Sequence, residues 1–238
     1  MFSAERSAVR ALTIRRRTFG PDHPCVATSM NNLGEVLFAE ARYKDAEQYY
    51  RSAVALAERE APPDSERLGK FLANLGKALT ARGRDAEASQ VLGRALAIWA
   101  RLGIPLEEAA TLGMLGVLKR QRGEYAEAEH MFRGALGRLP PGHPNAITAQ
   151  IDLAEVLRLR KRYEESEHQF RLAIALLEVR LGSEHPDRAA ALTLYASLLR
   201  DTGRTAEAKT LIAEARRIRQ AHARANGTGW VVDARVGQ

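Results

Sequence analysis

A segment of about forty residues recurs five times along the chain, and no other feature of the sequence constrains the fold as strongly. Each copy starts from a large apolar anchor, which a small residue follows directly. Thirteen residues after the anchor stands a second small residue, seventeen after it a large apolar residue, and twenty after it an alanine. The anchors are Leu33, Leu75, Leu115, Leu153 and Tyr195, at intervals of 42, 40, 38 and 42 residues. Five copies in one register predict a stack of similar structural units.

Each copy has the pattern of two amphipathic helices joined by a short turn. The small residue after the anchor and the small residue of the second helix let the two backbones approach closely. Glycine stands at the expected end of the first helix in three copies, as Gly83, Gly123 and Gly203, where a left-handed residue stops a helix. The first and fourth copies lack this glycine. Asp85 and Thr205 are placed to cap the second helix of their copies.

Composition excludes several other classes of protein. Of the 238 residues, 45% are hydrophobic, and no segment alternates polar and apolar residues as a strand does. No apolar run is long enough to cross a membrane, and the first twenty residues lack the apolar core of a signal peptide. The single cysteine, Cys25, cannot form an internal disulfide, which fits a reducing compartment. We therefore expect an all-α cytoplasmic protein.

The small–small–large–small spacing resembles that of the tetratricopeptide repeat, over roughly residues 3 to 225. Links of the form Gly-x-x-His-Pro, at residues 20–24 and 182–186, are similar to those of kinesin light chain and of many long bacterial repeat proteins of this kind, and residues 141–144 form a looser copy. The resemblance implies an all-α, right-handed superhelical solenoid of helix-turn-helix repeats. It also places the first helix of every repeat on the concave side of the superhelix.

On this pattern, residues 1–225 form the solenoid and residues 222–238 form a C-terminal tail that is partly disordered. The five full repeats are expected at residues 24–61, 63–102, 105–139, 143–181 and 185–221. Residues 1–19 match the second helix of a repeat whose first helix is missing. Two explanations stay open for this incomplete unit, the cut edge of a longer array or a helix that a partner covers. We favour the cut edge.

Twelve side chains on the concave faces of the first helices are the candidate binding residues. They are Asn31, Asn32, Glu35, Lys70, Asn74, Lys77, Met114, Val117, Arg120, Asp152, Glu155 and Arg158. The resemblance implies that an asparagine directly before the anchor holds a peptide backbone, and Asn32 and Asn74 occupy that place. A side-chain amide can donate and accept at once, as a peptide group requires. The cations Lys70, Lys77 and Arg120 favour an acidic ligand.

The sequence contains none of the catalytic or nucleotide-binding motifs that we sought, so we expect no enzyme activity, no cofactor and no small-molecule substrate. His23, His143 and His185 occupy one position in different repeats, which predicts helix caps and no metal site. The expected function is that of a scaffold that binds a peptide or a helix of a protein partner. One alternative is a regulatory segment of a larger signalling kinase or ATPase. RNA binding by the basic surface, with its net charge of +7, is a minor alternative, because acidic residues are interleaved with the basic ones.

Overall fold

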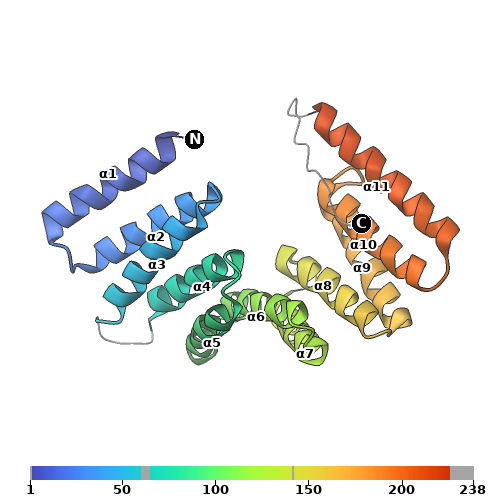
Figure 1. Ribbon diagram of the computed structural model, residues 1–238, viewed down its shortest axis with the longest axis horizontal. Coiled ribbons are helices and arrows are strands. Elements are labelled where there is room, and N and C mark those ends of the chain that lie inside the picture. Colours follow the sequence, from blue (N-terminus) through green and yellow to red (C-terminus); the bar gives the residue numbers. More distant parts are fainter. Residues whose placement is uncertain (1, 60–64, 141, 226–238) are drawn as a thin grey trace. The chain divides into compact units, whose positions relative to one another are not determined.

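The computed structural model describes residues 2–59, 65–140 and 142–225, and these residues form eleven helices and no strand. The helices are α1 (Phe2–Phe19), α2 (Pro24–Ala39), α3 (Tyr43–Ala57), α4 (Glu66–Ala81), α5 (Asp85–Leu102), α6 (Pro105–Gln121), α7 (Tyr125–Leu136), α8 (Pro144–Leu159), α9 (Tyr163–Leu181), α10 (Pro186–Asp201) and α11 (Thr205–Ala225) (Figure 1). The all-α fold predicted from the repeat pattern is confirmed.

The chain divides into two compact units, one ending at Leu139 and the other beginning at Pro140. The first unit contains α1 and the hairpins α2/α3, α4/α5 and α6/α7, and the second contains α8/α9 and α10/α11. Within each unit, the second helix of one hairpin packs against the first helix of the next, as α3 does against α4 and α9 against α10. Helix α1 packs against α2 in the same way, so it takes the place of the second helix of a preceding repeat.

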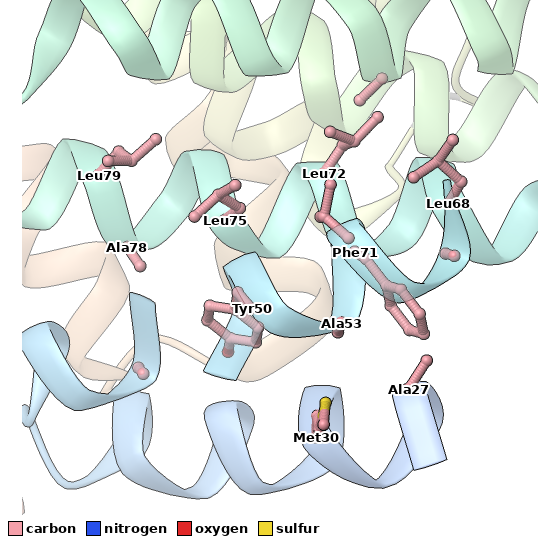
Figure 2. Close-up of a cluster of buried hydrophobic side chains, with 14 of the residues drawn as sticks. Ala27, Met30, Tyr50, Ala53, Leu68, Phe71, Leu72, Leu75, Ala78 and Leu79 are labelled. Atoms are coloured by element: carbon pink, nitrogen blue, oxygen red, sulfur yellow. The ribbon is translucent and has the colours of Figure 1, made fainter. Parts of the chain in front are cut away.

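Each hairpin of the first unit closes on a glycine that faces a large side chain. A Cβ atom added to Gly34 would lie 2.6 Å from the Tyr50 ring, and one added to Gly76 would lie 2.5 Å from Leu92. Gly116 faces Phe132 in the same way. Figure 2 shows Tyr50 of α3 buried between α2 and α4. The small residue after each anchor is therefore required because the facing side chain occupies the space of a Cβ atom.

The predicted buried positions are confirmed in all five copies, with one departure. Leu33, Tyr50 and Ala53 are at most 2% exposed, and their counterparts in the other repeats are buried as well. The departure is Ile212 of α11, which is half-buried. Among the described helices α11 packs only against α10, so no following helix covers this side of Ile212.

The turns inside the hairpins share one backbone conformation whether or not glycine is present. Gly83, Gly123 and Gly203 have φ values of 70°, 76° and 77°. Ala41 and Lys161 stand at the same place in the first and fourth repeats and have φ values of 58° and 59°. A residue with a side chain is strained in this left-handed region. The stack therefore imposes the turn geometry even where the sequence lacks glycine.

The histidines of the His-Pro links cap the helices that follow them, as predicted. The Nδ1 atoms of His23, His143 and His185 each accept a hydrogen bond of 3.2 Å from the backbone N–H two residues later. The capping roles expected for Asp85 and Thr205 were wrong. Each is the first residue of its helix, and the preceding Arg84 makes no side-chain cap. The turn fixes the start of α5 without a side-chain acceptor.

Helix α11 continues to Ala225 and so includes the first four residues of the segment expected to be a tail, 222–238. The rest of that segment, residues 226–238, lies outside the described residues.

Candidate functional site

The candidate binding residues come from the first helices of four hairpins. Helices α2, α4 and α6 of the first unit carry nine of them, and α8 of the second unit carries Asp152, Glu155 and Arg158. In the first unit α4 contacts both α2 and α6, so these helices bring their candidate residues side by side.

Asn31, Glu35 and Asn74 form a hydrogen-bonded network that joins α2 to α4. The Asn31 amide donates to Glu35 over 3.1 Å. The Nδ2 atom of Asn74 donates to Asn31 Oδ1 over 3.0 Å and to Glu35 Oε1 over 2.9 Å. Asn31 is only 2% exposed. Both amide hydrogens of Asn74 are therefore engaged within the protein, which differs from the open, peptide-holding amide that the sequence predicted.

Asn32 is exposed, and in the described part of the chain it has no hydrogen-bonding partner. It lies at a hollow of about 520 Å³ between the middle of α2 and the first half of α4. Lys70 also lines this hollow, is exposed, and forms no ion pair with any described carboxylate. The other lining residues are Thr28, Asn31, Glu35, Ser65, Glu66, Arg67 and Phe71. Of the two asparagines singled out by the sequence, only Asn32 has its amide free for a ligand.

Of the remaining candidates of the first unit, Lys77 is exposed and the other three are half-buried. The Lys77 ammonium lies 6.0 Å from the centre of the Phe38 ring, close enough for a cation–π interaction. Met114 and Val117 are half-buried, and Met114 packs against the core of the unit. Arg120 is half-buried too. The Met114 side chain is thus used in part by the core of the unit.

In the second unit the charged candidates pair with one another. Arg158 donates to both oxygens of Glu155, at 3.0 and 2.7 Å, and also to Asp201 in the next hairpin. The hydrogen bond with Glu155, opposed by burial and reinforced by Asp201, raises the pKa of Arg158. Asp152 is half-buried on the same helix. A ligand at α8 would have to compete with these ion pairs.

A set of glutamates that link successive hairpins was missed by the sequence reasoning. Glu47 of α3 is 3% exposed and binds Arg84 at 2.6 Å, as well as Arg82 and Arg51. Burial raises the pKa of Glu47, but Arg51 and Arg82 outweigh it, so that the pKa lies below its ordinary value. The same link joins Glu5 to Arg42 at 2.8 Å in the repeat before.

In the second unit Glu167 binds Arg204 at 2.7 Å in the same manner. In each of these three pairs the arginine stands 37 residues after the glutamate, and that constant interval is the signal that could have revealed them. We call these pairs the junction ion pairs. Because they tie the turn of one hairpin to the second helix of the hairpin before it, they fix the spacing of the first helices that carry the candidate residues.

Other kinds of site were sought over the same part of the chain. Among the described residues, His, Cys, Asp and Glu form no group of three that could hold a metal ion. None of the described helices is long and apolar enough to cross a bilayer.

Comparison with known proteins supports the repeat assignment. The family model of the tetratricopeptide repeat matches residues 1–59, 68–140 and 145–221. No curated protein matches the chain significantly. Three solved structures show the shared fold at low sequence identity, and none of them says what this chain binds.

The crystal structure of BtubC (BKLC) from P. vanneervenii is 19% identical, with a TM-score of 0.78 over 99% of this chain and 95% of that one. A putative kinesin light chain of Podosopora anserina with nearly identical repeats is 21% identical, with a TM-score of 0.70 over 87% of this chain and 99% of that one. The apo form of RapI is 12% identical, with a TM-score of 0.71 over 94% of each chain. This chain belongs to the tetratricopeptide repeat family, whose fold is typical of protein–protein interaction scaffolds.

Proposed function

We propose that the protein is a non-catalytic interaction module that binds an extended peptide or a helix, of acidic character, at the α2/α4 face. The observation that carries this proposal is the pair of unpartnered polar groups at one hollow, the Asn32 amide and the Lys70 ammonium. An amide matches both polar groups of a peptide bond, and an exposed ammonium favours a carboxylate on the ligand. The hollow is large enough for several ligand groups, at about 520 Å³.

The Asn31–Glu35–Asn74 network supports this role indirectly. The two amides donate to the same Glu35 oxygen, which holds that carboxylate in place at the hollow. Lys70 forms no ion pair with a described carboxylate, so its ammonium is open to a ligand. Asn74 is thus a positioning residue in the proposal, and Asn32 and Lys70 are the residues that contact the peptide.

The test starts from a display library of random peptides selected on the wild-type protein. The affinities of the selected peptides are then measured for Asn32→Ala, Lys70→Glu and the control Lys44→Glu. Lys44 is an exposed residue of α3, and its replacement by glutamate changes the charge by the same amount as Lys70→Glu. A few contact residues supply most of the binding free energy of an interface. We therefore expect each of the first two variants to weaken binding at least about tenfold.

Enrichment of acidic residues among the selected peptides would support the choice of ligand. The proposal is wrong if the library yields no binder, or if Lys44→Glu abolishes binding while Lys70→Glu leaves it unchanged. Circular dichroism of each variant shows whether helicity is retained. The regulatory role in a larger signalling protein and RNA binding stay predictions from the sequence.

A further inference from the structure

Helix α9 carries large apolar side chains on the side that faces away from the core of its unit. Leu172 is 39% exposed, Val179 is 85% exposed, and Ala175 between them is exposed as well. These three residues, which we call the α9 stripe, stand three and four positions apart and so lie along one face of the helix. Leu172 and Val179 each follow a buried residue, Phe170 or Leu177, by two positions and therefore point about 200° away from it.

The equivalent positions of the other second helices carry no large apolar residue where the structure describes them. The counterparts of Leu172 are Ser52, Arg94, Gly134 and Glu214, and the described counterparts of Val179 are Arg59, Arg101 and Ala221. Ser52 and Arg59 are exposed although α3 packs against both α2 and α4, and α3 does not pack against α5. This side of a second helix is thus open within a stack of any length. Packing inside the chain therefore does not account for the leucine and the valine of α9.

Two opposite charges stand on one flank of the α9 stripe. Arg171 and Glu178 are seven residues apart and so lie on the same side of the helix, two turns from each other. The Arg171 side chain is 65% exposed and binds Glu167 at 2.6 Å. The Glu178 side chain is 51% exposed and lies 3.6 Å from the Arg188 guanidinium. Each of the two groups keeps an exposed side that can meet a further charge.

We propose that the protein self-associates through the α9 stripe, with α9 of a second copy lying antiparallel across it. A two-fold axis beside Ala175 places Leu172 of each copy opposite Val179 of the other. Ala175 lies next to this axis, and its small side chain lets the two helices approach closely. The exposed leucine and valine are then covered in both copies at once.

The charges on the flank fit the same arrangement. The two-fold axis brings the same flank of both helices together, and it places Arg171 of one copy about 3 Å in height from Glu178 of the other, at a rise of about 1.5 Å per residue. This pair of opposite charges forms twice. One surface thus supplies both halves of an apolar and a charged contact, as an isologous interface requires. This self-complementarity is the reason for assigning the face to a second copy.

The first experiment is sedimentation velocity of the full chain at increasing concentration. One pair of helices buries less area than a standard interface, so we expect a weak dimer whose population rises with concentration. Val179→Arg and Leu172→Ser introduce the residues that α3 carries at these positions, which a repeat helix tolerates. Each should weaken the dimer at least about tenfold. The control Leu102→Arg changes a leucine of α5 that is 42% exposed and should leave the dimer within about twofold.

The second experiment tests the charged contact. Arg171→Glu and Glu178→Arg each place like charges opposite one another in a dimer of identical chains, so each variant alone should dimerise more weakly than the wild type. In an equimolar mixture, every contact of the mixed dimer joins opposite charges. We therefore expect the mixture to associate at least about tenfold more tightly than either variant alone.

The third experiment tests the position of the axis. Ala175→Cys in a Cys25→Ser background places two thiols beside the two-fold axis. Oxidation with copper–phenanthroline should then yield a covalent dimer on a denaturing gel. Ser52→Cys in the same background is the matched control, because Ser52 is equally exposed on α3 but outside the α9 stripe. It should cross-link at least about tenfold more slowly.

The proposal is overturned if the wild-type chain stays monomeric at every concentration, because the α9 stripe would then not bind a second copy. It is also overturned if Val179→Arg leaves the dimer intact, or if Leu102→Arg disrupts it equally. Failure of the mixed charge variants to associate would exclude the antiparallel arrangement. These outcomes do not depend on the proposed peptide site, which uses residues of α2 and α4.

Discussion

The junction of α3 with α4 and the junction of α5 with α6 share one apolar register but differ in their charges. In the first, the buried Glu47 binds Arg82 and Arg84 of the next turn. In the second, Ser89 stands in the place of Glu47, and its buried hydroxyl has no hydrogen-bonding partner. Glu124 stands in the place of Arg84 and pairs with Lys119 of its own hairpin.

The difference shows that the two kinds of contact are under separate constraints. Apolar packing must be complementary in every repeat, because each hairpin buries the face of its neighbour. A junction ion pair adds to this packing but is not required for it, since α5 and α6 pack without one. Glu47 is buried among three arginines, so its contribution to the stability of the fold depends on these ion pairs. The uncharged Ser89 has no such dependence.

The largest effect is expected from the packing that the two junctions share. Gly76→Leu in α4 places a side chain where Leu92 already lies, and we expect it to lower the free energy of unfolding by about 3 kcal/mol. Gly93→Leu in α5 is the matched control, because a Cβ atom there meets nothing within 4 Å. Chemical denaturation measures both variants. If both substitutions lowered the free energy of unfolding equally, the close contact between Gly76 and Leu92 would not be what stabilises the hairpin.

Removing the buried charge of the first junction should have the next largest effect. Glu47→Gln leaves three arginines without their shared carboxylate, and we expect a loss of about 2 kcal/mol at pH 7. Glu87→Gln is the control, since the Glu87 side chain binds Arg51 and Arg84 but is 40% exposed.

The contribution of Glu47 should also depend on pH. Because the pKa of Glu47 is lower in the folded protein than its ordinary value of 4.5, its contribution is present above that value. It is lost as the pH falls through the folded-state pKa. The difference in unfolding free energy between wild type and Glu47→Gln should therefore shrink in acid. A difference that stays constant down to about pH 3 would contradict this assignment.

A junction ion pair can also be built where the chain lacks one. Ser89→Glu together with Glu124→Arg reproduces the Glu47–Arg84 arrangement at the second junction, and we expect a favourable coupling of about 1 kcal/mol. A double-mutant cycle of thermal unfolding isolates this coupling from the two single effects. Zero coupling would show that the register at α5 and α6 differs from that at α3 and α4.

The smallest effect concerns the turns that lead to the arginines of the junction ion pairs. Ala41 precedes Arg42 and has a φ of 58°, while Gly83 precedes Arg84 and has a φ of 70°. Ala41→Gly removes the strain of a side chain in this region but adds backbone entropy to the unfolded state, so we expect a net gain of about 0.5 kcal/mol. Ala39→Gly, at the last residue of helix α2, is the control and should lower stability. Differential scanning calorimetry measures both.

The sequence by itself determined the fold, because every repeat must hide the same apolar positions and so repeats the same residues. The anchors, the small residues such as Gly76 and the His-Pro caps could all be read from their recurrence. The incomplete unit at residues 1–19 was visible for the same reason, since Ala4 and Ala11 match Ala46 and Ala53.

Only the tertiary structure decided which polar side chains are free. Asn32 and Asn74 are equivalent in sequence, yet Asn74 donates both its amide hydrogens to α2 while Asn32 faces the hollow. Likewise Ala41 takes a glycine conformation, and α1 leaves Ile14 exposed where α3 buries Leu56. Periodicity gives the face on which a residue lies, but a hydrogen bond or an uncovered face depends on which neighbours the packed helices bring within reach.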